Sequence, residues 1–170
     1  MKLRNAFLIM ILLALLDELF ALWGAMDFTY QSFGWVPYLA FSGMYLIFFR
    51  WDWKTQLYLG AFIGLIYDFC FGGSFPVNFI LYPLLLVEMS ILKGFIQGDR
   101  VYRILTGCFS VFLLEVIPVL IAVSFKQLHI SLVRWFVHQV VLTVLVNGVF
   151  MILIDGFVRD IENRNENKVS

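Results

Sequence analysis

Acidic side chains within long apolar runs are the residues of this sequence that could do chemistry. These residues are Asp17, Glu18, Asp68, Glu88, Glu115 and Asp155. A charge at the centre of a bilayer costs about 2.5–3.5 kcal/mol, so such groups are expected to be protonated, hydrogen-bonded inside a helix bundle, or paired with another chain. The functional interpretation is a proton or cation path, or a contact with a partner helix. The structural interpretation is a neutral acid bonded to a neighbouring helix. Both stay open for each residue other than Asp155, and for those five together we expect at least one functional contact.

Other reactive side chains do not form a recognisable catalytic set. His129 and His138 are nine residues apart, a spacing that suits neither a zincin helix nor a close pair of metal ligands. Cys70 and Cys108 lie in separate apolar stretches at different expected depths, which argues against a disulfide and against a metal site. The sequence has no nucleophile elbow and no glycine-rich phosphate loop. We therefore predict a protein that is not an enzyme and needs no cofactor.

The composition predicts an integral membrane protein. Of 170 residues, 62% are hydrophobic and 14% are charged, and the mean hydropathy is +0.89. A soluble chain of this length needs more polar residues to cover its surface. The sequence has no basic run that would indicate a nucleic-acid partner. The lipid bilayer is therefore the first expected partner.

Hydrophobic segments predict an all-α protein with six transmembrane helices. A helix needs about 20 residues to cross the hydrocarbon core, and inside it the backbone must be internally hydrogen-bonded. Six segments qualify, at about 6–23, 32–49, 55–71, 76–96, 101–124 and 132–156. We expect a six-helix transmembrane domain over residues 1–156 and a polar cytoplasmic tail over residues 157–170. At about 1.5 Å per residue, Asp17, Asp68 and Glu115 share a layer roughly 16–21 Å from the inner boundary, whereas Asp155 is expected to reach water.

Lysine and arginine residues predict the orientation. With the N-terminus inside, ten of the twelve basic residues fall on the inner side and only Lys126 and Arg134 fall outside. The excess of basic residues marks the cytoplasmic side, so both termini are predicted to be cytoplasmic. The first apolar run resembles a signal peptide, but Asp17 and Glu18 follow it and no cleavage site is present, so we expect an uncleaved span.

The stretch GLIYDFCFGGSFPVNF, residues 64–79, joins the third and fourth predicted spans. Gly72 and Gly73 favour a tight turn, and Pro76 is predicted to start the next helix, where a missing N–H costs nothing. Asp68 lies one turn before this hairpin and is expected to accept hydrogen bonds from its backbone amides or from Asn78. Gly60 and Gly64, four residues apart, predict a close approach between helices. Asn78 and Asn147 are expected to bridge helices in the same way as other intramembrane amides.

This stretch resembles the signature region of a known family, that of the rod shape-determining protein MreD. The matching residues are Gly64, Leu65, Ile66, Asp68, Gly72 and the apolar segment from Pro76 to Ile96. The detailed motif matches over residues 64–96. The whole chain matches in its length, its several spans, its short loops and its basic N-terminus. Family members often have another glycine where this chain has Pro76.

The resemblance implies a non-enzymatic scaffold in the bacterial cell membrane. It implies that the chain binds the single-span protein MreC and supports peptidoglycan synthesis by a glycosyltransferase and a transpeptidase in the elongation machinery. Asp68, Gly72 and Gly73 would hold the hairpin that shapes one face. The other acids would be interior or partner-facing contacts, namely Asp17, Glu18, Glu88 and Glu115. The family fold is also similar to the substrate-binding subunits (S-components) of energy-coupling-factor vitamin transporters.

That similarity supplies the main alternative function, a transporter substrate-binding subunit. Such subunits carry an A-x-x-x-A patch on the first helix, whereas here Ala14 is followed four residues later by Glu18. A vitamin pocket would also need outer polar and aromatic residues, some of which the segment at 24–35 could supply. A small membrane enzyme is the third possibility, and it would require a paired nucleophile and base or a metal set.

Overall fold

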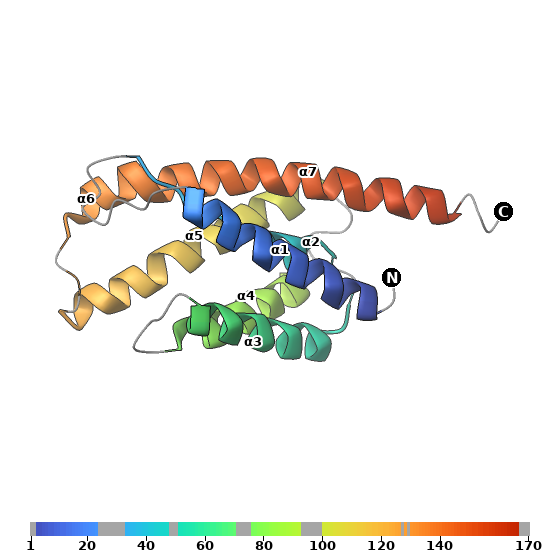
Figure 1. Cartoon of the computed structure of the whole chain (residues 1–170), viewed down its shortest axis with the longest axis horizontal. Helices are drawn as coiled ribbons and strands as arrows, with labels where there is room; N and C mark the ends of the chain where they lie inside the picture. The colour runs from blue at the N-terminus through green and yellow to red at the C-terminus, as the bar shows by residue number, and fades with distance from the viewer. Residues whose placement is uncertain are drawn as a thin grey trace.

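The computed structural model describes residues 3–23, 33–47, 51–70, 76–92, 100–126, 128 and 130–166. Every regular element in these ranges is helical, which confirms the expected all-α class. The elements are α1 (Leu3–Trp23), α2 (Leu39–Ile47), α3 (Trp53–Cys70), α4 (Val77–Leu92), α5 (Arg100–Ser124), α6 (Leu132–Trp135), the π-helical turn η2 (Phe136–Val140) and α7 (Val141–Glu166). Helix α6, η2 and α7 follow one another without a break and form a single long rod (Figure 1).

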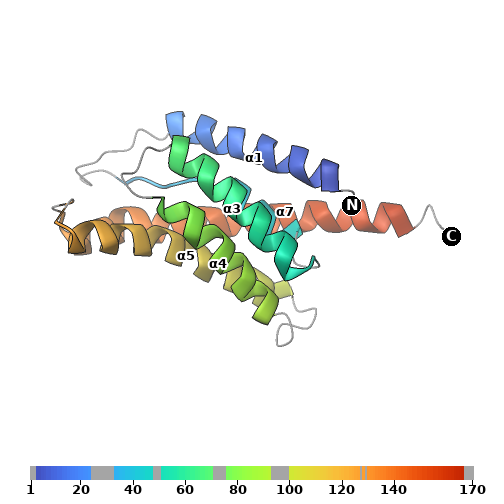
Figure 2. The ribbon, with the colours of Figure 1, turned by 90° about the horizontal axis from the view of Figure 1, so that it is seen from below.

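The helices form one elongated bundle with α2 at its centre. Helix α3 packs against α4, α5 packs against α7, and α2 packs against both α1 and α7. All residues of α2 from Leu39 to Leu46 are buried, and Phe41 and Tyr45 make ring contacts there. Helix α1 begins and α7 ends at the same end of the bundle (Figures 1 and 2). This placement is what two termini on one side of a membrane require.

The second predicted span differs from the structure. A continuous helix was expected over residues 32–49, but the helix covers only Leu39–Ile47, and residues 33–38 are not helical. Pro37 has no backbone N–H and disfavours helical geometry in the residue before it, so a helix cannot easily extend backward through it. The apolar composition wrongly predicted a helix for this part, in which Pro37 is buried, Phe33 is exposed and the other residues are half-buried.

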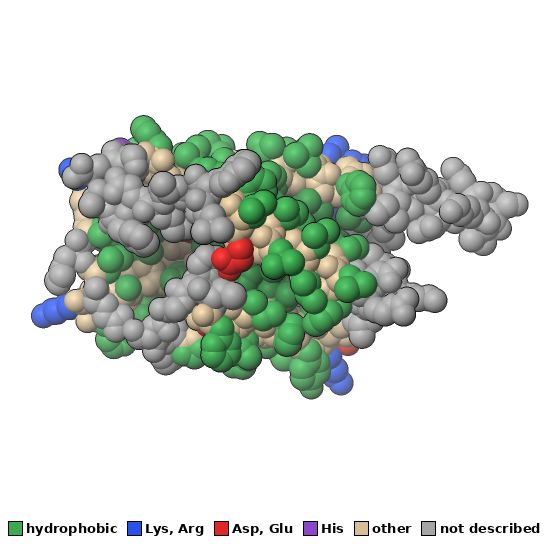
Figure 3. Space-filling model, in the orientation of Figure 1, with side chains coloured by type: hydrophobic (Ala, Val, Ile, Leu, Met, Phe, Trp, Pro, Cys, Tyr) green, Lys and Arg blue, Asp and Glu red, His purple; other side chains and the backbone are tan. Residues whose placement is uncertain are grey.

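The other predicted spans agree with helices more closely. Helix α4 ends at Leu92, and residues 93–99 lie outside the described part of the chain. Helix α7 continues to Glu166, so it includes much of the segment that was expected to be the polar tail. Two described helical stretches are long and apolar enough to cross a membrane, Arg100–Ser124 and Leu132–Arg159. Figure 3 shows hydrophobic side chains over much of one face of the bundle. The count of six spans remains a prediction.

The predicted close approach of helices at Gly60 and Gly64 is confirmed between α3 and α4. A Cβ atom added at Gly64 would lie 2.2 Å from the carbonyl oxygen of Asn78, and one added at Gly60 would lie 2.8 Å from Cα of Pro83. Both contacts are with backbone atoms, which cannot move aside as a flexible side chain can. The two glycines therefore let α3 lie directly against the first half of α4.

Candidate functional site

The non-helical segment at residues 33–38 is held by polar side chains of α7. The hydroxyl Oγ1 of Thr143 accepts the N–H of Val36 at 3.0 Å, and Oδ1 of Asn147 accepts the N–H of Tyr38 at 2.9 Å. In return, Nδ2 of Asn147 donates to the carbonyl oxygen of Val36 at 2.8 Å. Irregular backbone at membrane depth is tolerated only where the protein itself supplies such partners. Asn147 therefore bridges α7 and the segment at residues 33–38, as expected for an amide that joins two elements. Thr143, one turn earlier on α7, binds the same segment.

The π-helical turn η2 contributes a further contact to the same segment. The carbonyl oxygen of His138 accepts the N–H of Gly34 at 3.1 Å, and its imidazole stacks on Phe33 with ring centroids 4.6 Å apart. A π-bulge rearranges the helical hydrogen bonds and often occurs at functional positions. His138 therefore has a structural setting here, whereas His129 lies outside the described residues.

Asp17 of α1 caps the buried start of α2. Its Oδ1 accepts the N–H of Leu39 at 2.6 Å, and its Oδ2 accepts the N–H of Ala40 at 2.9 Å. The hydroxyl of Tyr67 on α3 also donates to Oδ2. Asp17 is 0% exposed, and the free N–H groups of a helix start carry a partial positive charge that a carboxylate complements. This one side chain therefore joins α1, α2 and α3.

Glu115 of α5 binds Tyr38, the residue directly before α2. Its Oε2 accepts the hydroxyl of Tyr38 at 2.9 Å, and its Oε1 accepts Nε2 of Gln139 at 2.5 Å. Tyr38 directly precedes Leu39, so Glu115 and Asp17 bind neighbouring residues at the start of α2. The polar network consists of Asp17, Tyr38, Tyr67, Glu115, Gln139, Thr143 and Asn147. The sequence analysis did not single out Tyr38, Tyr67, Gln139 or Thr143. Thr143 could have been found from its spacing, because it lies one helical turn before Asn147 in an apolar helix.

Asp68 performs the same task for α4. Its Oδ1 accepts the N–H of Asn78 at 3.0 Å, and its Oδ2 accepts the N–H of Phe79 at 2.8 Å. These are the second and third residues of α4, whose amides an N-cap side chain normally binds. The expected bracing of the hairpin by Asp68 is therefore confirmed. Pro76 directly precedes α4 rather than starting it, and Gly72 and Gly73 lie outside the described residues.

Asp155 is buried, and the expectation that it reaches water was wrong. Its side chain is only 4% exposed and is surrounded by three guanidinium groups. The distances to its carboxylate oxygens are 3.0 Å from Arg100, 2.5 Å from Arg103 and 3.3 Å from Arg159. Two of these arginines come from the start of α5, a long way along the chain, so the position of Asp155 in its own helix did not reveal them.

Two of the singled-out acids remain without such contacts. Glu18 on α1 and Glu88 on α4 are half-buried, and neither forms a hydrogen bond or ion pair with another residue that the structure describes. Their assignment as contacts to a partner stays a prediction.

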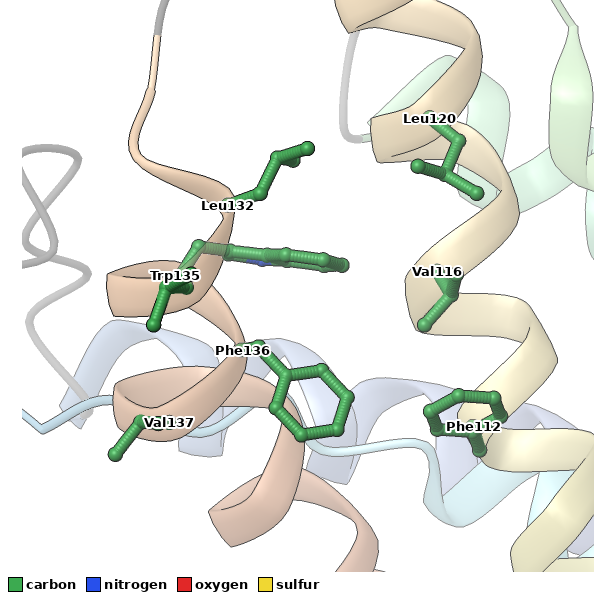
Figure 4. Close-up of a pocket in the computed structure, with 8 residues that line it drawn as sticks. Phe112, Val116, Leu120, Leu132, Trp135, Phe136 and Val137 are labelled. Atoms are coloured by element: carbon green, nitrogen blue, oxygen red, sulfur yellow. The ribbon is translucent and has the colours of Figure 1, made fainter.

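An apolar groove lies between α5 and the rod formed by α6 and η2 (Figure 4). Its volume is about 350 Å³. The lining residues are Phe112, Val116, Leu120, Leu132, Val133, Trp135, Phe136 and Val137. The ring of Trp135 extends from α6 toward Val116 across the groove. Trp135 is 3% exposed, and its indole N–H is buried without a hydrogen-bond acceptor among the described residues.

These contacts place four of the six singled-out acids in structural roles. Asp17 and Asp68 cap helices, Glu115 binds a tyrosine and an amide, and Asp155 binds arginines. Within the described part of the chain, no group of three or more histidine, cysteine or acidic side chains could hold a metal ion. The contacts of these acids can fix the shape of the helix bundle. The apolar groove between α5 and the rod of α6 and η2 can receive an apolar helix or chain.

Comparison with known proteins identifies the family. The family model of the rod shape-determining protein MreD matches residues 1–161, nearly the whole chain, which confirms the resemblance of the 64–79 stretch. No curated protein and no solved structure matched the chain, so the implied similarity to transporter subunits stays a prediction. The chain therefore belongs to the family of the rod shape-determining protein MreD, which gives it a role in cell shape as a structural membrane protein.

Proposed function

We propose that this chain is a non-enzymatic scaffold of the bacterial elongation machinery, located in the cell membrane. In this role it binds MreC and, with it, supports the glycosyltransferase and transpeptidase that make peptidoglycan. The observation that carries the proposal is the match of the MreD family model over residues 1–161.

The polar network supports a scaffold because it fixes the centre of the bundle. Asp17 ties three helices together at the start of α2, and Asn147 and Thr143 tie the preceding segment to α7. Satisfied buried networks make a structure rigid and specific. A rigid frame keeps its outer faces in a constant relative position, which is what several membrane partners need from a common platform.

The groove between α5 and α6–η2 is the docking surface that best suits the membrane helix of MreC. Helices associate in a bilayer mainly by van der Waals packing, and the groove presents branched and aromatic side chains on both walls. The buried N–H of Trp135 lacks an acceptor that a hydroxyl or carbonyl of an incoming helix can supply. The groove lies at the predicted outer end of the bundle, near the predicted outer loop between α5 and α6.

Other parts of the surface are assigned secondary contacts. Glu18 and Glu88, half-buried and without described partners, are proposed to face polar groups of MreC or of the synthases. Asp68 acts indirectly, because it holds the α3–α4 hairpin in shape. The alternative function as a transporter subunit receives no support from the groove, since a vitamin needs polar partners and the groove is lined by apolar side chains.

Affinity purification of the tagged full-length chain from its native membrane in mild detergent tests the proposal. We expect MreC and cell-wall synthases to be recovered. Recovery of paired ATPases and a coupling subunit instead would overturn the proposed function.

The groove is tested by Val116→Trp, which fills the space between α5 and α6. This variant is expected to lower MreC recovery by about tenfold, as loss of a central contact does. The control is Val149→Trp, at an exposed position of α7 outside the groove. Equal MreC recovery with the two folded variants would exclude the groove as the docking surface.

A further inference from the structure

Three arginines share one carboxylate where the start of α5 meets α7. This arginine cluster consists of Arg100, Arg103 and Arg159 around Asp155. Three positive charges and one negative charge leave these four side chains with a net charge of plus two. Arg103 lies nearest to the carboxylate, at 2.5 Å, and is the most buried of the three. The side chains of Arg100 and Arg159 are 42% and 47% exposed, so both can bind a further group.

The position of the cluster in α5 adds to its positive potential. Arg100 is the first residue of this 25-residue helix, and Arg103 follows within the first turn. The start of a helix carries about half a positive charge, so cations are normally unfavourable there and anions are favourable. Arg100 and Arg159 both contact the one carboxylate of Asp155 and remain exposed, so a second anion at this place would stabilise them.

The surroundings of the cluster fit a lipid rather than a free anion. Val101 follows Arg100 on α5 and is exposed, and Ile152, two turns before Arg159 on the same face of α7, is exposed as well. Figure 3 shows basic side chains at the edge of α7, toward its C-terminal end, bordered by hydrophobic side chains. The cluster lies at the end of the bundle where α1 begins and α7 ends, which is the predicted cytoplasmic end. Basic pockets between membrane helices on the cytoplasmic side bind phospholipid head groups.

We propose that Arg100 and Arg159 bind the phosphate of an anionic phospholipid in the cytoplasmic leaflet. The planar guanidinium group can bind two phosphate oxygens at once, which a lysine cannot match. The acyl chains lie along the exposed apolar side of α5 and α7 beside Val101 and Ile152. The bound lipid bridges α5 and α7 at the end opposite the groove, so this site does not depend on the binding of MreC.

Thermal unfolding of the purified full-length chain in detergent, titrated with phosphatidylglycerol or phosphatidylcholine, tests the proposal. Phosphatidylglycerol is expected to raise the unfolding temperature of the wild type, and phosphatidylcholine is not. The double variant Arg100→Gln/Arg159→Gln is expected to bind phosphatidylglycerol about thirtyfold more weakly, from the usual contribution of two basic residues near a lipid surface. A matched control is Lys54→Gln/Arg134→Gln, which removes two exposed cations elsewhere and is expected to keep the wild-type response.

Each contrary outcome has a definite meaning. An equal response of the double variant and the wild type would overturn the site. An equal loss in the control would show that only net charge attracts the lipid. The absence of any preference for phosphatidylglycerol over phosphatidylcholine in the wild type would overturn the proposal of a lipid site. If the double variant does not fold, Arg159→Lys keeps the charge and removes the bidentate geometry, and it is expected to weaken selective binding several-fold.

Discussion

Replacing Asp17 by alanine tests how the start of α2 is stabilised. In the folded chain the carboxylate accepts the N–H groups of Leu39 and Ala40 and the hydroxyl of Tyr67. The alanine variant leaves these three donors without their acceptor in a site from which solvent is excluded. A buried donor without a partner costs about 1–3 kcal/mol, so the loss is about 3 kcal/mol at the lower limit. We take the lower limit because the removed side chain leaves space that a water molecule can enter.

Hydrogen exchange of the Leu39 and Ala40 amides measures this loss directly. A cost of about 3 kcal/mol that falls on local opening corresponds to about a hundredfold faster exchange of amides near the start of α2. Thermal unfolding in mild detergent supplies the global measurement. The matched control is Glu18→Ala, at the adjacent position of α1, because Glu18 is half-buried and makes no described hydrogen bond. It should change exchange near α2 very little.

Tyr67→Phe separates the contributions to the cap. This variant removes one donor and leaves the two backbone bonds to Asp17, so its effect should be smaller than that of Asp17→Ala. If Asp17→Ala and Glu18→Ala had equal effects on exchange and on unfolding, the carboxylate would not be holding α2, and the description of the network would be wrong.

Three further substitutions test other contacts in thermal unfolding of the purified chain. Asp68→Ala should destabilise it by about 1–2 kcal/mol through loss of the α4 cap, and should lower MreC recovery more than Glu162→Ala near the end of α7; equal effects would contradict the capping role. Gly64→Ala should cost about 1–3 kcal/mol because its Cβ meets α4 backbone, whereas Gly156→Ala, with open space around it, should be neutral or slightly stabilising; the reverse order would refute the close contact. Asn147→Asp should destabilise the bundle because it turns a donor that serves two carbonyl groups into an acceptor, and an unchanged unfolding temperature would contradict this.

The sequence predicts those parts of the fold whose signals are local. Hydropathy located α5 and the rod that ends in α7 because these segments are long, apolar and bounded by polar residues. Asp68 was assigned its contact correctly because the acid, the glycine pair and Pro76 lie within one short stretch, so its partners are ten and eleven residues away. The close approach at Gly64 could also be read from spacing alone.

The parts that the sequence did not predict depend on distant residues. The N–H groups of Val36 and Tyr38 bind side chains 107 and 109 residues further along the chain. Hydropathy reports that a segment is apolar and does not report whether its backbone hydrogen bonds lie within the segment or elsewhere. Pro37 was the local sign that the helix starts late. Asp155 was misjudged for the same reason, because Arg103 comes from a position 52 residues earlier.

The contacts of the acids argue against a proton path and for a fixed frame. A path needs groups that pass a proton from one to the next and end at water. The carboxylates of Asp17 and Asp68 instead each accept hydrogen bonds from two backbone N–H groups at the start of a helix. The carboxylate of Glu115 accepts hydrogen bonds from the side chains of Tyr38 and Gln139. Movement of the Asp17 or Asp68 carboxylate would leave backbone N–H groups unpaired, and movement of Glu115 would leave two side-chain donors unpaired. A buried polar group without a partner costs several kcal/mol. Asp17, Asp68 and Glu115 therefore hold helix starts and the irregular segment in place. The surfaces that we propose for partners lie elsewhere, at the apolar groove, at the arginine cluster and at Glu18 and Glu88.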